Sequence, residues 1–581
     1  MNNFKELLAT SAEAYGRRTA FTLKEKGEYT DISFIRFYAE VKSLATALIR
    51  RGFSGERIAI TGPNSYNWFL VNAAAQISGC VTVPLDKDLK YGEFLQSLER
   101  CEAKVVFFDK KQEAMTKEAF ESGQTKIEWA FPLYKTDRVE TVTTLLEEGK
   151  ALVGSGDTSL DQIKIDADAV STLIFTSGTT SQSKIVMLSQ QNICANVQDM
   201  IQIIPFEPTD TNIALLPYHH MFGSTGQWVM LSNGVRTVYC DGLKYFQKNL
   251  KEYGVSVFVG VPLIMEQMYK KIMKTAAKEG LDGRIRRFSK VARVLNKAKI
   301  DVRRQIFHGV LDAIGGKLRM AVLGASAADP EVIQGFNDFG VLCVQGYGLT
   351  ETAPVLSAER PNHRKPGSVG IPLEHVEMKI ENPDENGIGE VVVRGPNVMK
   401  GYYGNPEATE AVLRDGWFYT GDLGYIDGDG YLFLTGRKKN VIVLKNGKNV
   451  FPEELEAELS KLPYQLETIV VGLPDKGDER DLVVSLKLVY DPEAFPDQTK
   501  EEIEQQVRED VEKLNDTVPP YKRIKRIFVT DEPMIKTSTG KVRRFLEIEK
   551  MLEEEKKLEE RRSAEAAETA TDEATTDEMA K

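Results

Sequence analysis

A run of small hydroxyl-bearing residues, Thr176 to Lys184, is the stretch of this sequence best suited to chemistry. It follows a mostly apolar segment, Ala169 to Phe175, which predicts a buried strand. Apart from Gln182, every residue between this strand and the lysine is Thr, Ser or Gly. Hydroxyls, unhindered backbone N–H groups and one point charge are the groups that bind polyphosphate. An ordinary Ser/Thr-rich surface turn is the alternative, and the run lacks the Gly-Lys-Ser/Thr ending of a Walker loop.

The elements that must position this loop alternate between strand and helix patterns. Arg57 to Ile60 and Cys80 to Leu85 predict short buried strands, and apolar residues recur at helical spacing from Phe37 to Leu48. Strands alternating with helices favour a parallel, doubly wound sheet. Three further candidate segments each follow an apolar run: Leu215 to Gly223, Gly324 to Ala327, and Gln345 to Thr352.

The pair His219-His220 allows more than one interpretation. It suggests the acyltransferase pattern H-H-x-x-x-D-G, but Ser224 and Thr225 occupy the Asp and Gly positions, so the general-base arrangement is incomplete. A histidine satisfied within the core is a second interpretation. The sequence carries no Ser-His or Cys-His signature of covalent catalysis.

Several of these strings resemble one family. Thr-Ser-Gly-Thr-Thr-x-x-x-Lys, from Thr176 to Lys184, is similar to the phosphate loop of the acyl-adenylate-forming superfamily, which includes acyl-CoA synthetases, luciferases and adenylation domains of peptide synthetases. Gln345 to Thr352 is the most specific matching string. The resemblance covers residues from about 11 to 546, and the segments Gly348 to Ser357 and Gly447 to Pro452 look like the long-chain fatty acyl-CoA synthetases.

The resemblance implies roles for the residues that match the family's motifs. Lys541 matches the catalytic lysine, Lys439 the interdomain hinge, and His220 a residue that lines the carboxylate pocket. Thr350 would bind phosphate, and Glu351 would be catalytic and a ligand of Mg²⁺. The residues implied to bind ATP or coenzyme A are Thr176, Ser177, Gly178, Thr179, Thr180, Lys184, Gly324, Ala325, Ser326, Gln345, Gly346, Tyr347, Gly348, Asp422, Arg437, Gly447 and Lys448.

The phosphate loop departs from the family's usual sequence. Ser181 and Ser183 replace the usual Gly and Pro, Ile185 replaces the Gly after the lysine, and Gln190 stands where many members have His. Replacing Gly adds a Cβ where the backbone can be tight, while the extra hydroxyls can still contact phosphate. We expect activity to survive with altered nucleotide affinity.

The same resemblance implies the domain organisation. We expect an α/β protein whose large N-terminal domain, residues 1–436, combines doubly wound α/β subdomains with a small β-barrel. A small, mobile α+β C-terminal domain would follow at 437–546, and an acidic tail, part helical and part disordered, at 547–581.

Composition excludes some classes of protein. The net charge of −11 argues against general nucleic-acid binding. Five widely spaced cysteines predict reduced thiols and no disulfide framework. The sequence shows no signal-peptide pattern at its start and no apolar run of membrane-spanning length. We therefore expect a cytoplasmic protein, peripheral at most on the inner face of the membrane.

Residues 270–304 form a basic insertion in this acidic protein. They contain 13 Lys or Arg against three acidic residues, and apolar residues from Ile285 to Leu295 recur at helical spacing between the cations. A basic amphipathic helix can bind an anionic membrane surface, at roughly 1 kcal/mol per well-placed cation. A solvated helix packed through its apolar side is the alternative.

Together these observations predict an ATP-dependent ligase that uses Mg²⁺ and coenzyme A. It would convert a medium- or long-chain fatty acid to an acyl-adenylate and then a thioester, releasing AMP and pyrophosphate. Acyl carrier protein is an alternative acceptor, and an aryl or short-chain acid an alternative substrate. A non-catalytic nucleotide-binding membrane scaffold is the alternative from a different class.

Overall fold

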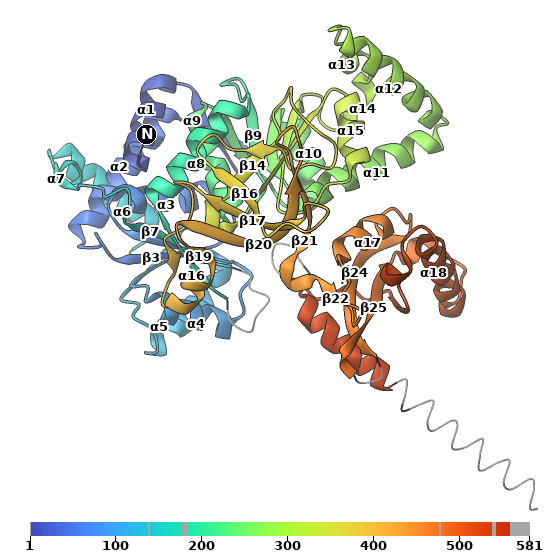
Figure 1. The fold of residues 1–581 in the computed structure, drawn as a ribbon. Helices are drawn as coiled ribbons and strands as arrows, with labels where there is room; N and C mark the ends of the chain where they lie inside the picture. The colour runs from blue at the N-terminus through green and yellow to red at the C-terminus, as the bar shows by residue number, and fades with distance from the viewer. Residues whose placement is uncertain are drawn as a thin grey trace, which may run out of the picture.

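The computed structural model describes residues 2–137, 140–176, 183–475, 478–536, 542–557 and 560. Two large sheets dominate the N-terminal part (Figure 1). In hydrogen-bonded order, the first contains β15 (Ile371–Pro372), β14 (Val355–Ala358), β13 (Leu342–Gly348), β12 (Met320–Leu323), β11 (Val257–Gly260), β9 (Thr211–Ala214), β10 (Arg236–Tyr239), β1 (Thr19–Glu25) and β2 (Glu28–Ser33). Its central strands from β13 to β1 are parallel, and the edge strands are antiparallel.

The second sheet carries the predicted phosphate loop. Its order is β18 (Gly401–Tyr402), β8 (Ile185–Ser189), β7 (Val170–Phe175), β4 (Val81–Leu85), β3 (Arg57–Thr61), β5 (Val105–Phe108) and β6 (Trp129–Pro132). The strands from β7 to β6 are parallel, whereas β7, β8 and β18 form antiparallel pairs. The predicted parallel, doubly wound arrangement of the N-terminal residues is therefore confirmed.

A small antiparallel sheet is the N-terminal part's third unit, where a small β-barrel was expected. It runs β16 (Glu377–Glu381), β17 (Gly389–Arg394), β20 (Trp417–Ile426) and β19 (Leu413–Arg414), with β21 (Leu432–Arg437) also paired to β20. One continuous hydrophobic core joins this unit to both large sheets, since it includes Ile174, Val257 and Val391.

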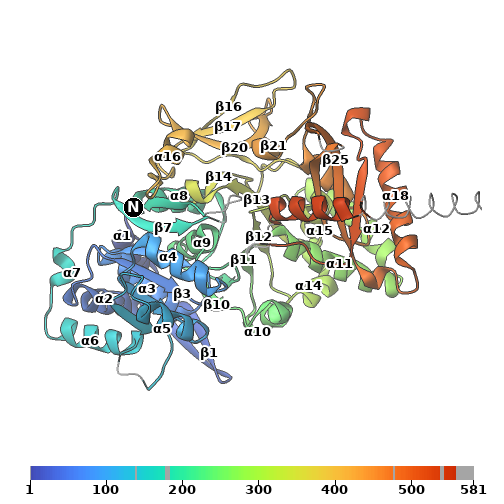
Figure 2. The same ribbon diagram turned by 90° about the horizontal axis from the view of Figure 1, so that it is seen from below.

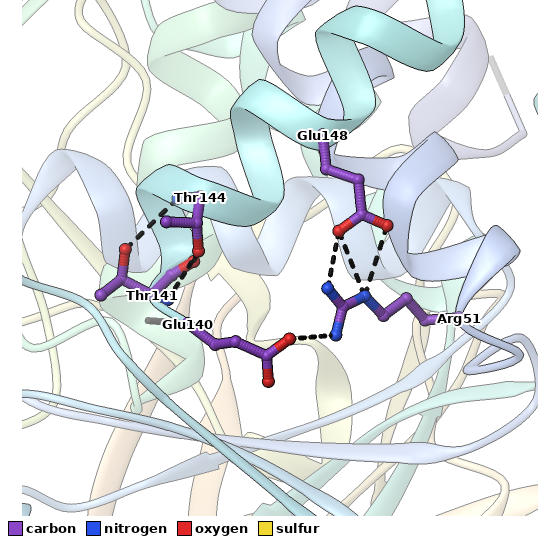
Figure 3. A network of polar contacts seen from close by, with 5 residues as sticks. All are labelled: Arg51, Glu140, Thr141, Thr144 and Glu148. Carbon is purple, nitrogen blue, oxygen red and sulfur yellow. Dashed lines mark hydrogen bonds and ion pairs between the residues drawn. The ribbon is translucent and has the colours of Figure 1, made fainter. Parts of the chain in front are cut away.

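Helices cover the large sheets, and a charged network fixes two of them. α2 (Phe34–Arg50) packs against α6 (Val142–Gly154). Arg51, directly after α2, donates to Glu148 at 2.7 Å and to Glu140 at 2.7 Å (Figure 3). Thr141 and Thr144 cap the start of α6 reciprocally in the same view. These contacts fix α6, which lies between β6 and β7 in the chain, against the end of α2.

The C-terminal residues form a separate unit with its own core (Figures 1 and 2). A sheet of β24 (Gln465–Asp475), β25 (Asp478–Tyr490) and β26 (Arg526–Thr530) packs with α17 (Pro452–Leu459) and α18 (Lys500–Asn515). A helix over residues 544–557 buries Met551 against the same sheet. The described part of the segment after 546 thus packs on this domain.

The basic insertion is helical and projects from the body at the upper right of Figure 1. α11 (Pro262–Lys278) follows β11 directly, and α12 (Asp282–Lys297) and α13 (Arg303–Ile306) come next. Ser289 and Ala292 are buried in α12, whereas Phe288, Val291 and Val294 are exposed. The apolar residues that recur at helical spacing along α12 therefore face largely outward.

Candidate nucleotide and acyl site

The predicted phosphate loop closes a hairpin between β7 and β8. These strands pair antiparallel, and Thr176 N donates to Lys184 O at 2.9 Å where the loop leaves and re-enters the sheet. Ser177, Gly178, Thr179 and Thr180 lie outside the described residues. Because its two ends are paired, Lys184 is anchored at the base of the loop.

Arg100 supports the base of this loop from a neighbouring helix. It lies on α4 (Tyr91–Cys101), donates to Ser183 O at 2.8 Å, and places its guanidinium 5.7 Å from the ring centroid of Phe175. Nothing in the spacing around Arg100 distinguishes it from a solvated cation. The structure nevertheless joins this arginine to the base of the loop.

Glu351 and Lys184 meet through a residue that sequence analysis did not select. Glu351 lies in a single 3₁₀ turn, η3 (Thr350–Thr352), directly after β13. Tyr402 Oη donates to Glu351 Oε1 at 2.9 Å, and Lys184 Nζ lies 4.4 Å from the centroid of the Tyr402 ring. The loop lysine and the predicted metal ligand are therefore brought together.

Tyr347, Asp422 and Arg437 form a second polar group beside Glu351. Tyr347 Oη donates to Asp422 Oδ2 at 2.7 Å, and Arg437 Nε donates to the other oxygen of the same carboxylate. Burial, followed by the charge of Asp422, raises the pKa of Tyr347 well above its ordinary value, so its hydroxyl remains a donor. A ribose hydroxyl bound to Asp422 would add to these two hydrogen bonds.

Close backbone packing explains the glycines of the predicted nucleotide strings. A Cβ on Gly348 would lie 1.8 Å from Pro354 O, and one on Gly346 would lie 3.3 Å from Ser357 O. Gln345 pairs with Glu359, whose Oε2 accepts from Gln345 N at 3.0 Å. β13 and the turn that carries Thr350 are thus held tightly against β14.

The loop after β12 contains the predicted residues Gly324, Ala325 and Ser326. Gly324 is buried, and a Cβ there would lie 3.1 Å from Phe222 Cζ. Ala325 and Ser326 are exposed, and Ala325 has a φ of +72°. The small residues thus allow this backbone to approach Phe222 closely.

The two histidines lie in different environments. His219 is buried, with Nε2 3.4 Å from Asp86 Oδ1, and burial lowers its pKa against the opposing charge of Asp86. His219 is therefore a core residue, but its Nε2 makes no hydrogen bond to any described residue, so it is not satisfied there. His220 is half-buried at the start of α9 (Met221–Ser232). Asn64 holds the segment before it by donating to Leu216 O at 2.7 Å and accepting from Tyr218 N at 2.8 Å.

An apolar pocket adjoins α9 and the Gly324 loop. It contains about 330 Å³ of empty space, its solvent-open part included. Among the described residues of its wall, Thr225 supplies the sole hydroxyl, which donates to Ala353 O at 3.1 Å. The lining residues are Met200, Phe206, Phe222, Thr225, Gly226, Val229, Val259, Val322, Pro354 and Val355. None of them is charged.

The interdomain junction contains Lys439. It lies in a 3₁₀ turn, η4 (Lys438–Asn440), directly after Arg437. Lys438 pairs with Glu390 of the N-terminal domain at 2.8 Å, and Asn440 donates to Glu453 of the C-terminal domain at 2.7 Å. The predicted hinge residue thus lies where the chain passes between the domains.

The remaining predicted residues are not brought to the Glu351 group. Gly447 and Lys448 form the turn between β22 (Ile442–Val443) and β23 (Asn449–Val450), and Lys448 Nζ lies 4.4 Å from the ring centroid of Tyr521. No hydrogen bond or ion pair in the described parts of the chain joins that turn to Glu351 or Asp422. Lys541 lies outside the described residues.

The donor set around Glu351 fits a magnesium ion that accompanies a nucleotide. Among the described residues, no three His, Cys, Asp or Glu side chains gather as a metal site of their own. Mg²⁺ is usually bound by one or two carboxylates together with substrate phosphates and water. A single carboxylate near the base of a phosphate loop matches that requirement.

Comparisons with known proteins agree with this geometry. The AMP-binding enzyme family matches residues 8–403, and the AMP-binding enzyme C-terminal domain matches residues 439–556. A long-chain-fatty-acid–[acyl-carrier-protein] ligase of Arabidopsis thaliana is 27% identical over 94% of this chain and 85% of its own length. A long-chain-fatty-acid–CoA ligase of Mycobacterium bovis is 29% identical over 81% of this chain and 79% of its own length.

Solved structures share the fold. ATP-bound MatB from Rhodopseudomonas palustris matches with a TM-score of 0.73 and 23% identity, over 94% of this chain and 99% of its own. Lys184, Tyr347 and Glu351 come from the region that the main family matches, which covers more than half of the chain, whereas Asp422 and Arg437 lie between the two matched regions. The chain therefore belongs to the AMP-binding enzyme family and is an acyl-adenylate-forming ligase.

Proposed function

We propose that this ligase activates a medium- or long-chain fatty acid and transfers the acyl group to coenzyme A. The apolar pocket beside Gly324 is the observation that carries the proposal, because the described residues of its wall include no charged one and their one hydroxyl is already hydrogen-bonded. An alkyl chain needs no polar partner in such a pocket. A substituted aryl acid or a dicarboxylic acid would need one.

The first half-reaction joins the carboxylate to the α-phosphate of ATP. A carboxylate oxygen attacks the α-phosphorus, and the bond to the bridging oxygen breaks as pyrophosphate leaves. Lys184 and Thr350 would stabilise the negative charge that gathers on the phosphates, and Lys541 would add a further cation. Magnesium bound at Glu351 would supply additional positive charge there. Tyr347 and Asp422 would hold the adenosine, and His220 would line the carboxylate position.

The second half-reaction forms the thioester. The sulfur of the acceptor attacks the acyl carbonyl carbon, AMP leaves, and the thiol proton passes to solvent. Lys439 would serve as the hinge of a domain rotation between the two steps, bringing Gly447 and Lys448 toward the pantetheine arm of coenzyme A. The relatives include ligases named for coenzyme A and for acyl carrier protein, so carrier protein is the alternative acceptor.

Pyrophosphate exchange across a series of carboxylic acids tests the substrate. We expect exchange to rise from short to long saturated acids and to stay low with benzoate. Gly226→Leu should shift the optimum to shorter acids, because position 226 lines the pocket and its Cβ would lie 3.5 Å from Val259. Gly309→Leu is the matched control, since this helical glycine has open space around it.

The outcomes separate the alternatives. A preference for benzoate or acetate in the wild type would contradict the fatty-acid proposal, and no exchange with any acid would favour the non-catalytic scaffold. Supplying coenzyme A or acyl carrier protein separately then identifies the acceptor from the thioester formed.

We propose further that α12 binds an anionic membrane surface. Val294 is 67% exposed, and Phe288 and Val291 are also exposed on the outward side of the helix. Arg284, Arg287 and Lys290 are exposed among them. An exposed apolar stripe flanked by cations suits the interface of an anionic bilayer. No helix in the described ranges is both long and apolar enough to cross a bilayer, so the contact would be peripheral.

A further inference from the structure

Tyr402 lies between two site residues that come from different parts of the chain. Its side chain is buried, with its hydroxyl 2.9 Å from Glu351 Oε1 and its ring centroid 4.4 Å from Lys184 Nζ. Lys184 enters β8 from the phosphate loop, and Glu351 follows β13 of the other large sheet. One aromatic side chain thus contacts both the predicted phosphate cation and the predicted metal ligand.

The backbone fixes Tyr402 independently of these two contacts. β18 pairs antiparallel with β8, so that Tyr402 lies opposite Val186, two residues beyond Lys184. Tyr402 N donates to Thr409 Oγ1 at 2.9 Å. Gly401 has a φ of +129°, and a Cβ there would lie 2.7 Å from Thr409 Cγ2. The ring is therefore held by its own strand and does not depend on a nucleotide for its position.

The hydroxyl of Tyr402 acts as a donor in this position. A carboxylate can only accept, so the direction of the hydrogen bond is fixed. This contact orients Glu351 by holding Oε1 and leaves Oε2 as the oxygen available to a metal ion.

We propose that Tyr402 is a positioning residue for adenylation, whose hydroxyl orients Glu351 for Mg²⁺ and whose ring holds the Lys184 ammonium at the phosphate loop. The two contacts use different parts of the side chain. The ring faces a cation, as in other cation–π pairs, while the hydroxyl acts on the carboxylate. The inference rests on the nucleotide-binding roles proposed for Lys184 and Glu351, and it does not depend on which acid is activated.

Tyr403, the residue directly after β18, provides a matched control. Its hydroxyl donates to Glu102 Oε2 at 3.2 Å, and the Arg57 guanidinium lies 5.0 Å from its ring centroid. Like Tyr402, it therefore joins a cation to a carboxylate, but it does so away from Glu351. If the loss of any tyrosine hydroxyl from this segment were enough to weaken nucleotide binding, Tyr402→Phe and Tyr403→Phe should weaken it equally.

Nucleotide binding without any acid substrate tests the proposal. The affinity for ATP is measured by titration calorimetry with Mg²⁺ and with EDTA, on the wild type, Tyr402→Phe, Tyr402→Leu and Tyr403→Phe. Tyr402→Phe should leave the metal-free affinity unchanged and reduce the gain from Mg²⁺ by about tenfold, the scale reported for partners of metal ligands. Tyr402→Leu should also weaken metal-free binding, because Lys184 then loses its ring. Tyr403→Phe should match the wild type in both conditions.

The results that would overturn the proposal for Tyr402 differ from those that would overturn the proposed function. An unchanged gain from Mg²⁺ in Tyr402→Phe, or an equal reduction in Tyr403→Phe, would overturn the proposal. Thermal unfolding monitors folding of each variant, and if Tyr402→Leu does not fold, the comparison of the two phenylalanine variants decides. In turnover assays, the activity of Tyr402→Phe should recover at high Mg²⁺, which a purely structural defect would not do.

Discussion

Glu359 is a buried carboxyl next to the nucleotide strings, and it links pH to stability. Its Oε2 accepts from Gln345 N at 3.0 Å, and its side chain is almost fully buried. Burial raises its pKa from 4.5 to about 7, although the hydrogen bond from Gln345 and the charge of Arg364 act in the opposite direction. Because the pKa of Glu359 is higher in the folded state than in the unfolded one, its stabilisation of the folded state is fully present below pH 4.5. It is lost as the pH rises through about 7.

Glu359→Gln should therefore stabilise the protein in a pH-dependent way. The amide keeps an oxygen acceptor for Gln345 N and cannot ionise, so the variant should have a higher Tm than the wild type at pH 8. The difference in Tm should shrink toward pH 5, because Glu359 of the folded wild type is then protonated as well. Each unit by which the folded pKa exceeds the unfolded pKa corresponds to about 1.4 kcal/mol. Thermal unfolding between pH 5 and pH 8 measures this, with the exposed Glu385→Gln as control. A difference that does not change with pH would refute the account.

Individual site residues were predictable where they belong to specific strings. Tyr347, Asp422 and Arg437 were selected from separate motifs, and the structure brings them into one hydrogen-bonded group. Tyr402 and Arg100 were missed because a lone tyrosine or arginine in an ordinary string carries no spacing signal. Their contacts arise from strand pairing and helix packing across the sheet, which become visible only in three dimensions.

At the scale of elements, the sequence predicted several of the strands around the phosphate loop and the helical insertion. The strands at 57–60, 80–85 and 169–175 and the helical character of the basic insertion agree with the structure within a few residues. The two-residue strand β18 was not predictable, because its pairing with β8 joins segments more than two hundred residues apart. Periodicity also could not decide which side of α12 packs. In the structure Ala292 is buried, while Val294 is exposed.

The membrane proposal is tested on α12 itself. We expect co-sedimentation with vesicles of phosphatidylcholine and phosphatidylglycerol, weakening as salt rises, since screening shortens the reach of Arg284, Arg287 and Lys290. Replacing all three with Gln, or Phe288, Val291 and Val294 together with Ser, should reduce binding at least tenfold. Leu466→Ser, at a residue 54% exposed on the C-terminal domain, is the control. Binding that is insensitive to salt, or equal to pure phosphatidylcholine vesicles, would reject the proposal.

At the scale of the whole molecule, two independent cores meet at a short junction. The C-terminal domain has its own hydrophobic clusters, and Lys438 and Asn440 contact opposite domains on either side of Lys439. The boundary near residue 437 is what the family resemblance implies. The order of strands in the first large sheet could not be predicted from the sequence, because neighbouring strands such as β1 and β10 are distant along the chain.

The central claim is that the carboxylate of the substrate attacks the α-phosphorus of ATP. Turnover of a fatty acid labelled with oxygen-18 in its carboxylate, followed by mass spectrometry of the nucleotide products, tests this most directly. The account predicts AMP that carries one heavy oxygen, together with unlabelled pyrophosphate. Unlabelled AMP would indicate that water attacks the phosphorus, and labelled orthophosphate with ADP would indicate attack at the γ-phosphorus. Either result would contradict the account.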